Sequence, residues 1–396
     1  GISIVLYGLL FVSSPLVAHF FGRQELTALV RATGLLLFFN ALSITQVTIL
    51  TKRIDFKTKT KASLISAILS GIVGIAMAYT GFGVWALVGQ MLSKQLLYTL
   101  CLWVLNKWWP TLKFSASSFR YMWGFGWKLL VSGLLENIWN QLYQVVVGKF
   151  YSPATLGQYT RGREYASIFS SNLSSIIQRV SYPVLSEMQD DKHRMVEGYR
   201  RVIKMTMFIT AICMISLGAV AEPLIYCLIG PQWHEAATYL PLICISMAFY
   251  PLHAINLNML KVLGRSDIFL YLEIIKKIIG IIPICIGIFI DIYWMLVASI
   301  LIGFVSLYLN SWYTGKALGY TFWKQLRDIA PFFGIAFTIA ISVFFFKYLP
   351  ISNWLILPIQ IVVGVVVCII ACHKSQLEEY KEVLNMINPI LNKIKK

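Results

Sequence analysis

Apolar residues gather into twelve stretches of about 20 residues, separated by short polar connections. A helix needs about 20 apolar residues to cross the hydrocarbon core of a bilayer. Each stretch is therefore predicted to be a membrane-spanning helix, and the fold class is all-α and polytopic. The predicted spans are residues 1–19, 26–50, 62–81, 83–106, 122–149, 158–186, 203–226, 236–260, 267–290, 292–315, 328–348 and 353–373.

Lysine and arginine are concentrated in every second connection, for example at 52–61, 190–204 and 316–327. The intervening connections, such as 80–83 and 290–293, are short and carry few basic residues. This alternation is typical of polytopic proteins, whose cytoplasmic loops are rich in Lys and Arg. It predicts a multi-pass protein of inner-membrane type with its C-terminus in the cytoplasm.

Composition supports this interpretation and excludes several classes of protein. Mean hydropathy is +0.71 and only 13% of residues are charged, whereas a soluble domain is typically about 25% charged. The net charge of +17 follows from the basic connections, so nucleic acid is not an expected partner. The seven cysteines form no CxxC pair, and the five histidines have no metal-ligand spacing. No nucleotide-binding loop or catalytic triad pattern occurs, so we expect no metal, no cofactor and no enzymatic activity.

An internal repeat organises the helices. Shifts of 208 and then 209 residues align Pro15, Gly22, Lys52, Gly71 and Trp85 with Pro223, Gly230, Lys261, Gly280 and Trp294. Such an offset spans six helices, an even number, so the two copies share one orientation, as in transporters with parallel repeats. We expect an N-lobe at 1–106, a C-lobe at 121–315, two further helices within 328–373 and a cytoplasmic tail at 374–396.

The repeat also bears on the start of the chain, and the tail shows a separate pattern. The second copy has two helices ahead of the counterpart of residue 1, so we expect two preceding helices and fourteen spans in the natural protein. In the tail, one helical face carries apolar residues and lysines lie opposite, which predicts an amphipathic helix on the cytoplasmic surface, broken near Pro389. The apolar face comprises Leu377, Tyr380, Leu384, Ile387 and Leu391.

The helix predicted at 122–149 is the most polar. Glu136 and Asn140 lie four residues apart, and Asn137 and Gln141 extend the polar stripe. Lipid cannot satisfy amides, so this face must contact water or protein. It either lines a hydrated substrate cavity or forms hydrogen bonds between helices. Glu136 either exchanges a proton during transport or pairs with a buried cation such as Lys94.

Other charged and polar residues within spans are candidates because burial in the bilayer is costly. Arginine binds phosphate oxygens through two parallel hydrogen bonds, so Arg31, Arg161, Arg163 and Arg179 would suit a cavity for a pyrophosphate-linked lipid. Arg161 and Arg163 can instead extend to headgroups at the outer interface. The remaining candidates are an expected Glu273–Lys277 ion pair with Lys276 beside it, and a patch of His253, Asn256 and Asn258.

Four runs of sequence resemble the polysaccharide (Wzx-type) flippases. They are residues 156–164 (LGQYTRGRE), 179–191 (RVSYPVLSEMQDD), 250–260 (YPLHAINLNML) and 264–267 (GRSD). The chain is similar to the lipopolysaccharide, colanic-acid and teichuronic-acid branch of the multidrug/oligosaccharidyl-lipid/polysaccharide exporter superfamily. The resemblance implies fourteen helices in two parallel lobes. It also implies movement of undecaprenyl-pyrophosphate-linked oligosaccharide from the inner to the outer leaflet by alternating access. The implied partners are the lipid-linked oligosaccharide, membrane lipids, a polysaccharide polymerase and chain-length machinery.

Three other functions compete with the flippase interpretation. A multidrug or cation antiporter of the same superfamily would favour acidic cavity residues, whereas the intramembrane charge here is mainly basic. A peptidoglycan-precursor flippase fits the resembling runs less well. A membrane glycosyl polymerase or ligase would carry a large outer loop for its chemistry, and the outer connections here are short.

Overall fold

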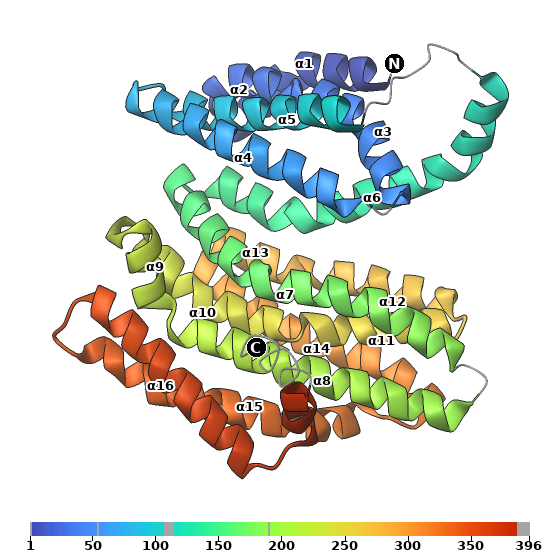
Figure 1. Cartoon of the computed structure of the whole chain (residues 1–396), viewed down its shortest axis with the longest axis vertical. Coiled ribbons are helices and arrows are strands. Elements are labelled where there is room, and N and C mark those ends of the chain that lie inside the picture. The colour runs from blue at the N-terminus through green and yellow to red at the C-terminus, as the bar shows by residue number, and fades with distance from the viewer. Residues whose placement is uncertain (1, 54, 107–114, 189–190, 386–396) are drawn as a thin grey trace, which may run out of the picture. The chain divides into compact units, whose positions relative to one another are not determined.

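The computed structural model describes the backbone of residues 2–53, 55–106, 115–188 and 191–385 (Figure 1). It also describes their side chains, except for a number of those within 119–136 and 175–187 and that of Ser266. These residues are almost entirely helical, and no strand occurs among them. The all-α prediction is confirmed.

The helices follow the twelve predicted spans closely. The first half of the chain forms α1 (Ile2–Phe21), α2 (Glu25–Gly34), α3 (Leu36–Lys52), α4 (Phe56–Tyr79), α5 (Val84–Asn106), α6 (Ala116–Phe150) and α7 (Pro153–Glu187). The second half forms α8 (Lys192–Ala219), α9 (Ala221–Ile229), η1 (Pro231–Trp233), α10 (His234–Ala248), α11 (Tyr250–Val262), α12 (Ser266–Ile279), α13 (Ile281–Phe289), α14 (Ile292–Leu318), α15 (Phe322–Phe344), η2 (Phe345–Tyr348) and α16 (Asn353–Lys374).

Four predicted spans are divided into two consecutive helices, and a proline lies at three of the breaks. Pro223, Pro251 and Pro283 lie within the first three positions of α9, α11 and α13. The first N–H groups of a helix have no partner within it, so proline is tolerated there. It would interrupt the hydrogen bonding of a continuous helix. The fourth break, between α2 and α3, follows Gly34.

Aspartates at the ends of connections fix where several helices begin. The Asp55 carboxylate accepts a hydrogen bond from the backbone N–H of Thr58 at 3.0 Å, which lowers the pKa of Asp55. Asp191 accepts from the N–H groups of His193 and Arg194, and Asp291 caps α14 in the same way. Such caps satisfy backbone donors that the helix itself leaves unpaired.

Eight helical segments in the described part of the chain are long and apolar enough to cross a membrane. They confirm a polytopic membrane protein. The predicted spans that fall short of this measure are α5, α6, α7 and the α12–α13 segment. Three of these four helical segments carry the polar residues singled out above, including the α6 amides, the α7 arginines and Glu273 with its neighbouring lysines.

The chain divides into two compact units, residues 1–133 and 134–396, so that the division falls inside α6. In the first unit α4 packs along α5, and α1 packs against α2. The close approach of α4 and α5 depends on Gly74, where an added Cβ would lie 2.9 Å from Cβ of Gln90. A small buried core of Leu50, Ala62 and Leu102 joins α3, α4 and α5.

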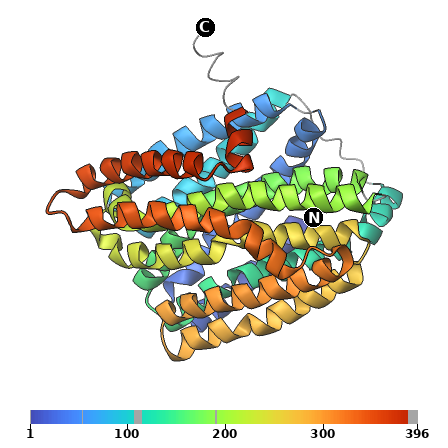
Figure 2. The same ribbon diagram turned by 90° about the horizontal axis from the view of Figure 1, so that it is seen from below.

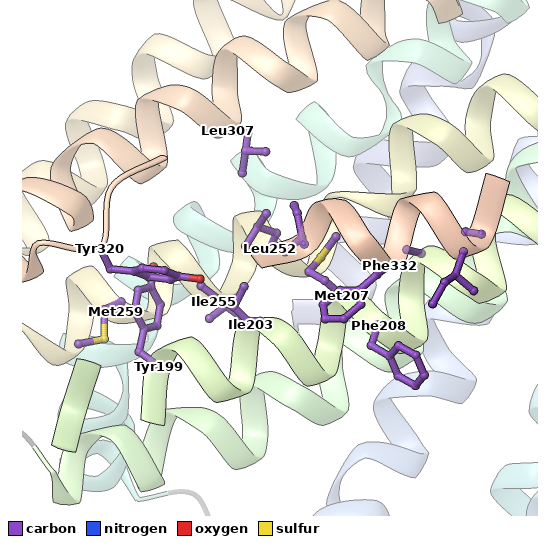
Figure 3. Packing of buried hydrophobic residues seen from close by; sticks show 14 of the residues in the cluster. Tyr199, Ile203, Met207, Phe208, Leu252, Ile255, Met259, Leu307, Tyr320 and Phe332 are labelled. Atoms are coloured by element: carbon purple, nitrogen blue, oxygen red, sulfur yellow. The ribbon is translucent and has the colours of Figure 1, made fainter. Parts of the chain in front are cut away.

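The second unit has a larger core around α8. This helix packs against α15, α10 and α7, and Figure 3 shows side chains of α8, α11 and α15 meeting in the core. Tyr199, Ile203, Met207, Ile255 and Met259 are fully buried there. The two helices α15 and α16 pack against each other, and α16 also contacts α9.

Helix boundaries agree with the repeat found in the sequence. Shifted by 209 residues, Phe56–Tyr79 falls on 265–288, and the α12–α13 segment covers Ser266–Phe289. The same shift places Val84–Asn106 on 293–315, within α14. The assignment of the two copies to separate lobes remains a prediction.

The tail packs on the protein. Residues 378–385 form a helix that follows α16 and lies against α8 (Figure 2). Leu377, Tyr380 and Val383 pack against the core of the second unit, whereas Leu384 is exposed. The amphipathic pattern is therefore present, but Leu377 and Tyr380 of its apolar face are covered by protein. Ile387, Pro389 and Leu391 lie outside the described residues.

We expect Gly74→Ala to lower the free energy of unfolding by about 1–3 kcal/mol, because the new methyl group forces α4 and α5 apart. Gly71→Ala is the matched control on the same helix, since an added Cβ there meets nothing within 4 Å. It should be neutral or stabilising by up to about 1 kcal/mol. Thermal unfolding in detergent measures both, and equal melting temperatures would refute the close-contact role of Gly74.

Candidate functional site

A buried network of polar side chains is centred on Asn256, one of the residues selected from the sequence. Its side-chain oxygen accepts hydrogen bonds from the hydroxyls of Tyr199, at 2.6 Å, and Thr314, at 3.0 Å. The Asn256 amide donates to Oε1 of Gln325 at 3.1 Å, and the Gln325 amide donates back at 3.2 Å. The network thereby links α8, α11, α14 and α15 within one unit.

The network continues toward the surface through the turn between α14 and α15. Gln325 donates to the carbonyl of Tyr320, whose hydroxyl donates to Asp328 at 2.7 Å. Arg200 binds both oxygens of Asp328, at 2.5 and 2.7 Å. The Tyr320 ring contacts the Tyr199 ring edge to face (Figure 3). Burial raises the pKa of Tyr320, and its hydrogen bond to Asp328 raises that pKa further.

His253 belongs to a second polar contact between α11 and α14. Its Nδ1 lies 3.2 Å from the amide nitrogen of Asn310, which is fully buried. The Asn310 side-chain oxygen has no hydrogen-bond partner among the described residues. An unpaired buried acceptor costs about 1–3 kcal/mol. His253 and Asn310 thus form a polar contact inside the second unit, and the Asn310 side-chain oxygen can still accept a hydrogen bond.

Arg31 is held in the first unit with part of its guanidinium free. Its Nε donates to the buried hydroxyl of Ser14 at 2.9 Å, and its guanidinium carbon lies 4.1 Å from the centre of the Phe11 ring. Among the described residues no acceptor meets the two Nη groups. This geometry fixes the side chain and leaves the two terminal nitrogens available to a phosphate oxygen.

The arginines near the start of α7 have protein partners. Arg161 pairs with Glu164 at 2.7 Å and lies over the Trp233 ring, while its side chain remains 48% exposed. Arg163 donates to the backbone carbonyl of Asn140 at 3.0 Å, which connects α7 to the polar stripe of α6. Asn137, Asn140 and Gln141 are exposed within the second unit, and the first two make further interactions.

The α12 ion pair differs in register from the prediction. The sequence predicts an ion pair of Glu273 with Lys277 at i,i+4, whereas Glu273 binds Lys276 at i,i+3. Both spacings place side chains on one helix face, so sequence spacing alone does not select between them. Lys277 has other interactions and is half-buried. The helices that carry Glu136 and Arg179 are described, but these two side chains lie outside the described residues.

Sequence reasoning missed most partners of Asn256. Tyr199, Thr314 and Gln325 come from three different helices, and nothing in local spacing joins them. One usable signal was Gln325, an amide in the first turn of α15, ahead of the apolar part of that helix. Asp328 carried a similar signal, because it is an acidic residue at the beginning of a predicted span.

Comparison with known proteins identifies the family. Residues 1–238 match the family described as polysaccharide biosynthesis protein. The chain belongs to this family. The match covers more than half of the chain, and it confirms the resemblance to the polysaccharide branch of the exporter superfamily.

Curated relatives carry names in agreement. The teichuronic acid biosynthesis protein TuaB of Bacillus subtilis (strain 168) is 26% identical over 68% of this chain and 56% of its own length. The succinoglycan biosynthesis transport protein ExoT of Rhizobium meliloti (strain 1021) is 24% identical over 68% of this chain and 54% of its own. The lipopolysaccharide biosynthesis protein WzxC of Escherichia coli (strain K12) is 20% identical, over 72% and 59%. The chain thus spans a little over half the length of these relatives.

A solved structure shares the fold. The lipid II flippase MurJ, in an inward closed conformation, matches with a TM-score of 0.73 at 16% sequence identity. The match covers 97% of this chain and 82% of that chain. At this identity the likeness shows the polytopic helical fold alone.

We expect Asn256→Ala to lower the free energy of unfolding of this protein by about 2 kcal/mol more than Asn258→Ala does. Both asparagines are buried on α11, but only Asn256 has side-chain hydrogen bonds among the described residues. Its loss leaves the Tyr199 hydroxyl and the Gln325 amide with fewer partners in an apolar core. Thermal unfolding of the two variants in detergent compares them directly, and equal losses would show that the network contributes nothing beyond packing.

Proposed function

We propose that the protein is a secondary-type flippase that moves lipid-linked oligosaccharide repeat units across the inner membrane for polysaccharide biosynthesis. The observation that carries the proposal is membership of the polysaccharide biosynthesis family, whose relatives include a succinoglycan transport protein. The intended substrate is an undecaprenyl-pyrophosphate-linked oligosaccharide, passed from the cytoplasmic to the outer leaflet. A polysaccharide polymerase and chain-length machinery would receive the product. The protein acts as a carrier and performs no covalent chemistry.

The physical task of such a carrier is to move a charged headgroup across hydrocarbon. Burying an unpaired phosphate in an apolar medium costs many kcal/mol. Arginine lowers this cost because it stays charged at any depth and binds phosphate oxygens through paired hydrogen bonds. Arg31 is held by Ser14 and Phe11, and its Nη groups meet no acceptor in the described part of the chain, so it has the geometry for this role. We include Arg179 as the second expected phosphate ligand.

Alternating access is the proposed cycle. Two lobes rock about a cationic cavity that takes the pyrophosphate and sugars, while the prenyl chain remains in lipid. Arg163 and the α6 amides Asn137, Asn140 and Gln141 would contact the sugar hydroxyls, to which amides both donate and accept hydrogen bonds. The Arg163–Asn140 contact supports this part of the proposal, because it brings α6 and α7 together at their polar faces.

Replacing Arg31 and Arg179 together by glutamine should reduce polysaccharide export by at least about tenfold, because both expected phosphate ligands lose their charge. Complementation of a strain that lacks its own exporter, scored by surface polysaccharide, measures the effect. Arg23→Gln is the matched control, since Arg23 is exposed in the connection between α1 and α2. Normal export by the Arg31/Arg179 double variant, at normal protein levels, would remove support for a cationic cavity.

The orientation is tested separately. We expect the basic connection at 52–61 and the C-terminal tail to face the cytoplasm, and the connection at 80–83 to face the opposite side. Alkaline phosphatase fused after residue 81 should be active, and the same enzyme fused after residue 55 or 385 should be inactive. The reverse pattern would overturn the inner-membrane topology with a cytoplasmic C-terminus.

A further inference from the structure

A cavity of about 660 Å³ lies in the second unit, among α8, the turn at 319–321, the start of α15 and the C-terminal helix at 378–385 with Leu377 before it. None of the candidate residues from the sequence analysis lines it. Its charged lining consists of four basic residues and two acidic residues. They are Arg200, Lys204, Lys324, Arg327, Asp328 and Glu379.

Two of the basic residues are neutralised by the two acidic ones. Arg200 binds Asp328, and Lys204 binds Glu379 at 2.6 Å. Because the Glu379 side chain is only 8% exposed, this pair also holds the C-terminal helix on α8. A second ion pair, Arg201–Glu382 at 2.7 Å, lies on the same contact.

The other two basic residues retain their charge. Lys324 donates to the backbone carbonyl of Gly319 at 2.9 Å, and a carbonyl neutralises no charge. Arg327 is exposed and pairs with no carboxylate among the described residues. The two lie three residues apart on α15, so they are neighbours on one face. The cavity therefore keeps two positive charges close together.

The same cavity has an apolar side. Pro331, Phe332 and Leu377 line it, and Phe332 belongs to the buried core. Lys324 and Arg327 lie in the first turns of α15, directly before the apolar part of that span. Cations at the end of a span, beside apolar side chains, match a ligand that combines an anionic head with an acyl chain.

We propose that this cavity binds the phosphate of an anionic phospholipid. Lys324 and Arg327 contact the phosphate, and the glycerol and first acyl carbons lie along Pro331 and Leu377. A bound lipid would connect α8, α15 and the C-terminal helix, each of which contributes to the lining. This inference does not depend on the transport function, because binding is measured on the purified protein.

The test uses the full chain in detergent, with phosphatidylglycerol and phosphatidylcholine as probes. Phosphatidylglycerol should raise the melting temperature and appear as a bound lipid in native mass spectrometry. The double variant Lys324→Gln/Arg327→Gln should bind it about 30-fold more weakly. Each basic residue near an anionic lipid contributes about 1 kcal/mol to binding, and the loss of about 2 kcal/mol corresponds to about 30-fold. The charge-conserving variant Lys324→Arg/Arg327→Lys should retain binding and shows that the site tolerates substitution.

Lys316→Gln/Lys374→Gln is the matched control. It removes two charges at exposed positions near the ends of α14 and α16 that do not line the cavity. Equal losses of binding in the two glutamine variants, or no preference for phosphatidylglycerol over phosphatidylcholine, would overturn the proposal.

Inorganic phosphate is the third probe, added to the same purified protein. If it stabilised the protein as much as the lipid and blocked lipid binding, the site would be one for soluble phosphate, and the lipid assignment would be wrong.

Discussion

Hydrocarbon offers no hydrogen-bond partner, and this constraint governs how polar groups are distributed in the protein. Helices satisfy the backbone within each span, so the remaining problem concerns side chains. In the second unit the solution is a shared one. Asn256 alone bonds to groups from α8, α14 and α15, and this shared bonding requires those helices to pack at a fixed register. The network therefore holds together the end of the unit from which the basic connections emerge.

The same constraint explains where charge is tolerated. Asp328 and Glu379 each meet a cation, and both ion pairs lie at the ends of spans. On α12, Glu273 is paired with Lys276 of the same helix. Arg31 is a different case, because a hydroxyl and an aromatic ring hold it without neutralising it. Unneutralised charge inside a span is expensive. The negatively charged ligand proposed above would offset this cost at Arg31.

Sequence alone predicted the helices well and the contacts between them poorly. Span length is set by bilayer thickness, which is why the ends of α1, α5, α14 and α16 lie within a few residues of the predicted ones. Proline alone does not predict the breaks within spans, because Pro15, Pro241, Pro331 and Pro358 lie inside continuous helices. Asn256 was selected, but its partners Tyr199, Thr314 and Gln325 were not, since they converge only after packing. For Glu273, helical spacing allowed two partners and packing selected the nearer one.

The amphipathic pattern of the tail is compatible with two kinds of contact, with a membrane surface or with the protein itself. An amphipathic helix with lysines on its polar face is an expected feature of a membrane surface. Here Glu379 and Glu382, which that interpretation left unused, bind Lys204 and Arg201 on α8. Acidic residues on a helix beside anionic lipid would be repelled, whereas beside the basic end of α8 they are attracted. The positions of the two glutamates thus decide in favour of docking on the protein. Lys324 and Arg327, which those glutamates do not reach, are left to attract an anion from the membrane.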